Sequence, residues 1–159
     1  MKILKWFFLG PVLLLIFVFS GCELNKAYGD YQVTKMGKKD GGVTVYEKVE
    51  LSQDEYKKYG GVNGVIPVHS EKSSRADKFD YLAKTEYILM RESNPKLSKS
   101  HSWIYRKKDK KVMGEFVSYG RSGGDFPTII QHPSSFSCAD VVGIELDIEK
   151  QIFNIKGEM

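Results

Sequence analysis

Cysteine is scarce in this chain. There are two among 159 residues, too few to form the disulfide framework of a small secreted domain. A surplus of one charge sign is missing as well. The formal net charge is +4, but two lysines lie in the first 21 residues, and the rest of the chain carries 22 basic against 20 acidic side chains. A dedicated nucleic-acid binder carries a larger basic surplus, so we expect no nucleic-acid partner.

Sequence motifs for metal binding and catalysis are also missing. The chain has no CxxC, HExxH or EF-hand pattern, and its three histidines (His69, His101 and His132) lie far apart. Gly120 to Gly124 holds a serine among glycines, but not in the GxSxG frame of a hydrolase, and it predicts a turn with positive φ angles. We therefore expect no metal, no cofactor and no enzymatic activity.

The N-terminal segment has the features of an export signal. Two lysines precede fourteen uncharged residues, WFFLGPVLLLIFVF, a run that is short for a transmembrane helix of about 20 apolar residues. The segment ends in Phe19-Ser20-Gly21-Cys22, which resembles the lipobox of bacterial lipoproteins. In that family two small residues precede an invariant cysteine, as Ser20 and Gly21 do here, whereas Phe19 replaces the usual leucine.

The resemblance implies that residues 1–21 are a signal peptide and that Cys22 carries a diacylglyceryl group on its sulfur and an acyl group, such as palmitate, on its amine. Several acyl chains on one residue make attachment effectively permanent, because each buried methylene contributes about 0.8 kcal/mol. The protein is then expected on a bacterial cell membrane, facing the periplasm. In enterobacteria-like members of the family, aspartate after the cysteine retains the protein in the inner membrane, so Glu23 favours the outer membrane. The alternative is an uncleaved signal anchor.

Lipidation of Cys22 leaves Cys138 without a partner in the chain. A lone exposed thiol is a liability in an oxidising periplasm, so we expect Cys138 to be a small buried core residue. The alternatives are an intermolecular disulfide or a reactive nucleophile activated by His101 or His132.

Residues 22–30 are predicted to form a lipid-anchored tether, and residues 31–159 a single globular domain. Patterns of period two predict three β hairpins. Their paired strands cover residues 31–36 with 43–49, residues 102–105 with 112–119, and residues 141–148 with 152–155.

Helices are expected to be few. Ser52 and Glu55 form a capping-box pattern that predicts a short helix over residues 53–59, ended by Gly60-Gly61. A second short helix is expected up to residue 83, followed by a buried strand over residues 85–92 that Asn94-Pro95 breaks. Antiparallel hairpins with one or two short helices predict an α+β fold.

The strongest local charge feature is a basic cluster at the turn of the second hairpin. It is a candidate contact with anionic head groups or an acidic partner, worth about 1 kcal/mol per cation at a charged membrane surface. The alternative is a solvated turn whose lysines keep the strands from pairing with other chains. The cluster consists of Arg106, Lys107, Lys108, Lys110 and Lys111.

These features predict a lipid-anchored, non-catalytic envelope lipoprotein that acts through contacts with an unidentified envelope protein in the periplasm. The alternative function is binding of a lipid or cell-wall fragment in two expected loops, residues 60–76 and 120–138, because loops of that length are uncommon without a function. A third hypothesis is an enzyme that uses Cys138 or a loop serine. Tyr56 and Tyr59 are either core residues or part of a recognition face.

Replacing Cys22 by alanine tests the anchor. The variant is expected to remain unprocessed and to lose the acyl groups, because the thiol that accepts the diacylglyceryl group is gone. Mass spectrometry of the mature protein and fractionation of the envelope measure both effects. The same processing and the same membrane attachment in the variant would contradict the lipobox assignment.

Overall fold

The computed structural model describes residues 21, 23–58, 68–125, 133–142 and 147–155. A helix over residues 23–40, here named the N-terminal helix, comes first in the chain. The elements after it are β1 (Gly42–Val45), β2 (Val49–Leu51), α2 (Gln53–Lys58), β3 (Val68–Ser70), the 3-10 turn η1 (Ala76–Lys78), β4 (Tyr81–Arg91), β5 (Lys96–Arg106), β6 (Val112–Ser122), β7 (Ser135–Ser137), α3 (Ala139–Val142), α4 (Ile148–Ile152) and β8 (Phe153–Ile155).

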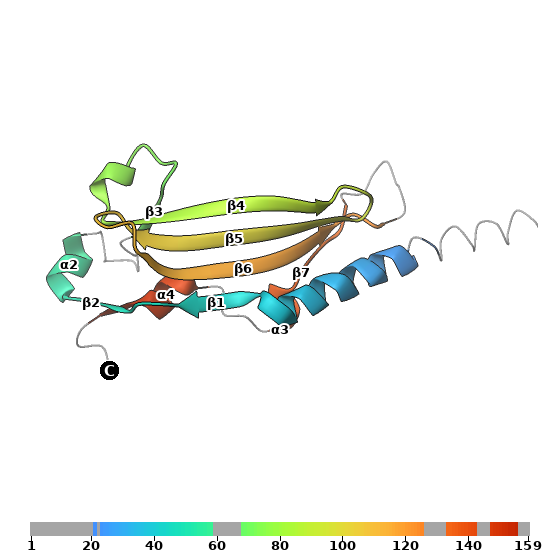
Figure 1. Ribbon diagram of the computed structural model, residues 1–159, viewed down its shortest axis with the longest axis horizontal. Coiled ribbons are helices and arrows are strands. Elements are labelled where there is room, and N and C mark those ends of the chain that lie inside the picture. Colours follow the sequence, from blue (N-terminus) through green and yellow to red (C-terminus); the bar gives the residue numbers. More distant parts are fainter. Residues whose placement is uncertain (1–20, 22, 59–67, 126–132, 143–146, 156–159) are drawn as a thin grey trace, which may run out of the picture.

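Six strands form one long twisted sheet in the order β1-β6-β5-β4-β3, with β7 paired to β6 beside that path (Figure 1). All neighbours in this sheet run antiparallel except β3, which runs parallel to β4. The short strands β2 and β8 pair separately and in parallel. This mixed and mainly antiparallel architecture confirms the predicted α+β fold class.

The centre of the sheet is made of β4, β5 and β6, each eleven residues long. The predicted hairpin of residues 102–105 with 112–119 is confirmed, because β5 pairs with β6 around the turn after Arg106. Asn94-Pro95 lies in the turn between β4 and β5, as the break predicted there requires. At about 3.3 Å per residue, these strands form a sheet about 36 Å long.

The strand predicted for residues 31–36 is wrong, because these residues belong to the N-terminal helix. Residues 23–30, which were predicted to form a tether, are the first part of the same helix. The helix buries a stripe at every fourth residue, made of Gly29, Val33 and Gly37. Two of these three positions are glycines, so the stripe carries little hydrophobic signal in the sequence.

The glycines bring the helix backbone close to the sheet. A side chain at Gly37 would collide with Cys138, and a Cβ at Gly29 would lie 2.9 Å from the Cδ of Arg121.

The strand pairing expected for residues 43–49 is also wrong. Strand β1 pairs with β6 and not with residues 31–36.

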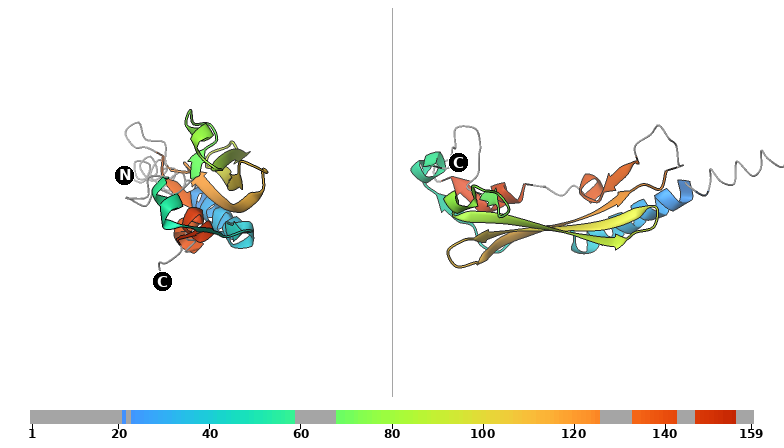
Figure 2. Two further views of the ribbon diagram at one scale, coloured as in Figure 1. Left: turned by 90° about the vertical axis from the view of Figure 1, so that its left-hand side faces the viewer. Right: turned by 90° about the horizontal axis from the view of Figure 1, so that it is seen from above.

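The hydrophobic core has two parts on opposite faces of the sheet. Val117 and Gly114 lie three residues apart on β6, so they face opposite sides. The N-terminal helix covers the face of Val117 at one end, and α4 covers the face of Gly114 at the other end (Figure 2, right). The first cluster contains Val33, Leu97, Val117, Tyr119 and Cys138, and the second contains Leu51, Ile104, Met113, Ile152 and Phe153.

The predicted C-terminal hairpin is wrong. Val141 lies in α3, and Ile148 begins α4, while residues 143–146 fall outside the described residues. Asp147 caps α4 by accepting a hydrogen bond from the Lys150 backbone N–H at 3.4 Å. The alternation of apolar residues continues into β8, but β8 pairs with the distant strand β2.

The capping box is confirmed at α2. Ser52 N–H donates to Oε2 of Glu55 at 2.9 Å, and Glu55 N–H donates to Oγ of Ser52 at 3.2 Å. The second predicted helix is wrong beyond residue 78, because Tyr81 begins strand β4 and Leu82 is buried in it. The expected loops are shorter than predicted: β3 and β7 occupy part of them, and residues 59–67 and 126–132 lie outside the described residues.

Polar contacts also hold the N-terminal helix on the sheet. Arg121 of β6 is 3% exposed, and its Nε forms an ion pair with Asp30 of the helix. Its Nη1 donates to Oγ of Ser134 at 3.1 Å. Asp125 accepts from the Ser134 N–H at 2.6 Å and lies 3.2 Å from Nζ of Lys26. The helix is thus fixed to β6 and to the segment that leads into β7.

These contacts predict a pH dependence of stability. The hydrogen bonds from Ser134, together with Lys26, lower the pKa of Asp125 to about 2, below its value of about 4 in an unfolded chain. The stabilisation by this carboxylate is therefore present above about pH 4 and is lost as the pH falls through about 2. At pH 5 the urea midpoint of unfolding is expected to be higher for the wild-type protein than for Asp125→Asn. This difference should shrink as the pH falls toward 2. A constant difference across this range would contradict the assignment.

Candidate ligand groove and open sheet edge

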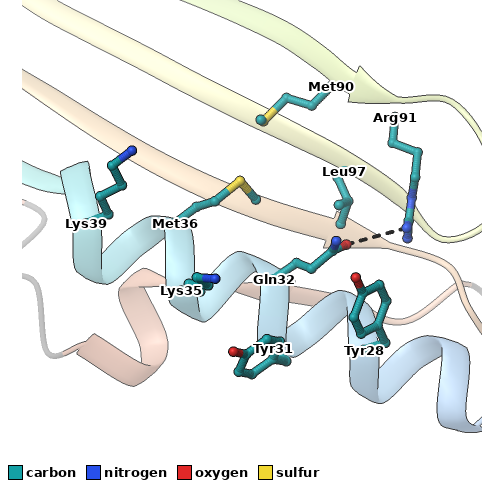
Figure 3. A pocket seen from close by; sticks show the side chains of 9 residues that line it. All are labelled: Tyr28, Tyr31, Gln32, Lys35, Met36, Lys39, Met90, Arg91 and Leu97. Carbon is teal, nitrogen blue, oxygen red and sulfur yellow. Dashed lines mark hydrogen bonds between the residues drawn. The ribbon is translucent and has the colours of Figure 1, made fainter.

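A groove of about 540 Å³ lies between the N-terminal helix and the ends of β4 and β5 (Figure 3). Ligand sites in proteins commonly have volumes of about 300–1,000 Å³. The helix contributes Tyr28, Tyr31, Gln32, Lys35, Met36 and Lys39, β4 contributes Met90 and Arg91, and β5 contributes Leu97.

The six helix residues form a second stripe beside the buried one. They recur at intervals of three and four residues, as one face of a helix requires. Sequence reasoning missed this stripe because it assigned residues 31–36 to a strand, in which Tyr31 and Lys35 would share a face with Val33. The helical spacing of Tyr28, Gln32 and Met36 was the signal available for finding it.

The ionisable lysine and arginine side chains of the groove give it a positive charge. Lys35, Lys39 and Arg91 line it, and no carboxylate occurs among the nine described residues that line it. Arg91 is fixed by its Nε, which donates to the Pro95 carbonyl oxygen at 2.9 Å, while its Nη1 lies 3.4 Å from Oε1 of Gln32. Its Nη2 is buried and has no hydrogen-bond partner among the described residues. The guanidinium thus has hydrogen-bonding capacity left over.

The outer edge of β4 is open beside this groove. Strand β3 pairs only with residues Tyr81 to Ala83, so on the side of β4 away from β5 no described strand pairs with residues 84–91. Tyr87 is 80% exposed, and Ile88, Leu89 and Met90 are each about half exposed. The strand predicted for residues 85–92 is confirmed, but its predicted burial is wrong.

The five residues of the basic cluster lie at the β5–β6 turn, and acidic or aromatic side chains of the same chain surround most of them. Arg106 pairs with Glu47 and lies 3.0 Å from Asp109. The hydrogen bonds of Lys111 and Arg106 lower the pKa of Glu47 against the effect of desolvation. Much of the cluster's charge is therefore balanced locally.

The remaining lysines of the cluster differ in their surroundings. Lys107 lies 3.3 Å from Asp77, and Nζ of Lys110 lies 5.0 Å from the centre of the Tyr105 ring. Lys108 is exposed. The role of these residues at an anionic surface stays a prediction.

Cys138 is fully buried in the first core cluster, which confirms it as a core residue. The Tyr119 N–H donates to its Sγ at 3.2 Å. Burial and the neighbouring Asp40 raise the pKa of the Tyr119 hydroxyl to about 12. The hydrogen bonds of the Cys138 thiol in the described residues are with Ser118 and Tyr119, whereas Nε2 of His101 bonds to Glu115, and His132 lies outside those residues.

His101 belongs to a polar network on β5 and β6. Its Nε2 lies 2.7 Å from Oε2 of Glu115, and its ring lies edge-on to Trp103 with centres 4.9 Å apart. The hydrogen bond from Tyr46, followed by that of His101, lowers the pKa of Glu115. This network contains an acid, an imidazole and a phenol.

The other candidate residues from the sequence have structural roles or lie outside the described residues. Gly123 and Gly124 have φ angles of 84° and 90°, so the glycines serve the predicted turn. His69 stacks on Phe79, with ring centres 4.6 Å apart. Cys22 and Tyr59 lie outside the described residues, as does the side chain of Tyr56.

A comparison of the chain with protein-family models, curated proteins and solved structures finds no match. In the ranges that the structure describes, no helix has the length and apolar character needed to cross a membrane. Within the same ranges, no three His, Cys, Asp or Glu side chains come together as a metal site. Function is therefore inferred from the lipobox resemblance, the open edge and the groove.

Proposed function

We propose that the chain is a lipid-anchored, non-catalytic envelope lipoprotein that acts through protein contacts on the periplasmic side of a bacterial membrane, the outer membrane being favoured by Glu23. The resemblance of Phe19 to Cys22 to a lipobox supports the anchor. The open edge of β4 is the observation that supports protein contact.

The open edge has the length and surface of a strand-binding site. Eight residues, 84–91, extend about 26 Å and offer backbone donors and acceptors to an added strand. Proteins usually cover such an edge, or place charges or proline on it. Here the middle of the edge is apolar, and Tyr87 and Ile88 point to opposite faces of the sheet. An added strand therefore finds apolar side chains on both faces.

The charge around the open edge favours an acidic partner. Its margin carries the cations Lys84, Arg91, Lys96 and Lys99 and the acids Glu86 and Glu92. This surplus attracts a segment with acidic side chains and speeds its association. The proposed partner is therefore an extended, partly apolar and acidic segment of an envelope protein.

A second candidate function, binding of a lipid or cell-wall fragment, is supported by the groove. The lining comes from the N-terminal helix, β4 and β5, instead of the loops that sequence analysis named. A groove with apolar walls and three cations suits an amphipathic anion.

A photo-reactive amino acid at position 87 tests the proposed protein contact. Irradiation of the intact envelope is expected to give one discrete adduct, because the exposed side chain of Tyr87 lies where an added strand would pair. The matched control is the same amino acid at Lys48, which is exposed between β1 and β2 and belongs to neither the open edge nor the basic cluster, and it should give no adduct. Adding Ile88→Lys is expected to remove the adduct.

Equal adducts from positions 87 and 48, or no adduct from either, would contradict contact through β4. An adduct with twice the mass of the chain would contradict an envelope-protein partner and would identify the partner as a second copy of this chain. Gel mobility and mass spectrometry of the adduct distinguish these results.

A further inference from the structure

We infer that the groove between the N-terminal helix and β4 binds a long-chain fatty acid, with the carboxylate at Arg91 and the acyl chain along Met36 and Met90. The inference deepens the second candidate function by naming its ligand class. It does not depend on whether the edge of β4 binds a protein.

The charge of the groove selects an anion. Lys35, Lys39 and Arg91 are its cationic lining residues, and the described lining residues include no acid that would neutralise them. A groove with walls of one charge sign concentrates ligands of the opposite sign. A neutral lipid with an acyl chain of the same length as the fatty acid gains nothing from the positive charge of the groove.

Arg91 is the proposed anchor for the carboxylate. The Pro95 carbonyl oxygen holds its Nε, which fixes the guanidinium at one end of the groove, beside Gln32 and Tyr28 (Figure 3). Its buried Nη2 has no partner among the described residues. A buried donor without a partner is unfavourable, and a small movement of the guanidinium lets a carboxylate accept two hydrogen bonds from it.

The remaining walls suit an acyl chain. Met36 and Met90 lie on opposite sides of the groove, and Leu97 lies between them and Arg91 (Figure 3). Methionine side chains are flexible and adapt to an irregular apolar ligand. The volume of about 540 Å³ suits one acyl chain with its head group better than a phospholipid with two chains.

The proposed lipid anchor places the groove near a source of such ligands. The N-terminal helix is described from residue 23, the residue after Cys22 in the sequence, and Tyr28 lies about 7.5 Å from residue 23 along this helix at 1.5 Å per residue. A fatty acid released from membrane lipids therefore has a short path into the groove. This step depends on the proposed anchor, whereas the chemistry of the groove does not.

The test uses the full lipoprotein in nanodiscs of phosphatidylcholine and a palmitate that carries a photo-reactive diazirine. After irradiation, label is expected in the peptides that contain Met36 and Met90. Unlabelled palmitate should compete, whereas the same concentration of monopalmitin, which has the same chain but no charge, should not. Association of the protein with the nanodisc before the probe is added reports on the anchor separately.

Three variants locate the carboxylate. Arg91→Gln is expected to weaken palmitate binding at least tenfold, and Lys35→Gln about twofold to threefold, because Lys35 contributes only to the field. Lys38→Gln, on the same helix but outside the groove, is the matched control and should leave binding unchanged. A urea midpoint for Arg91→Gln separates lost binding from lost folding, and Lys35→Gln provides the test if Arg91→Gln does not fold.

Several results would overturn the inference. Equal competition by palmitate and monopalmitin would show apolar adsorption without recognition of the anion. Stronger competition by lysophosphatidylglycerol than by palmitate would assign the site to a phosphate lipid. Label spread evenly over the chain, or equal binding by the Arg91 and Lys38 variants, would exclude the groove as the site.

Discussion

The buried guanidinium of Arg121 determines where the N-terminal helix can lie. A buried cation without a charged partner costs several kcal/mol, so Arg121 requires a carboxylate close to β6. Asp30 provides it from the helix, and the absence of a side chain at Gly29 leaves room for the arginine. This ion pair fixes the rotation of the helix as well as its position. One stripe therefore faces the core and the neighbouring stripe faces the groove.

The functional surfaces follow from this placement. The groove exists because Met36 and Gln32 lie opposite Met90 and Arg91, which requires the helix to lie against the ends of β4 and β5. Asp40 holds the end of the helix by accepting a hydrogen bond from the Tyr119 hydroxyl at 2.8 Å. The N-terminal helix, the groove and the open edge therefore form one packed unit, and in the proposed lipoprotein this unit follows Cys22 in the sequence.

Local signals in the sequence predicted part of the fold. The β5–β6 hairpin, the capping box at Ser52 and the turn at Asn94-Pro95 each depend on residues close together in the chain. The burial of Cys138 followed from redox chemistry. The two wrong strand pairings have a common cause: β1 pairs with β6, and β2 pairs with β8, across long stretches of sequence. Alternation within a strand does not identify such a partner.

The groove was missed for a related reason. Its residues come from two segments about 60 residues apart, and the helical stripe that would have predicted one side was read as a strand. The glycines of the buried stripe gave no hydrophobic signal. The open edge was missed because the apolar residues Tyr87 to Met90 were expected in the core, whereas they are about half exposed or more, and no described strand pairs with this edge beyond Ala83. Exposed apolar residues on a strand cannot be distinguished from core residues by sequence alone.

Hydrogen exchange of the backbone amides measures whether the ion pair between Asp30 and Arg121 holds the N-terminal helix on the sheet. In the wild-type chain, the amides of residues 29–37 are predicted to exchange slowly, because the helix is packed on the sheet through Val33 and held by Asp30. In Asp30→Asn these amides should lose protection while those of β5 and β6 keep most of theirs. Fast exchange of residues 29–37 in the wild type would show that the helix is not packed on the sheet. Equal protection in the variant would show that Asp30 does not hold the helix there.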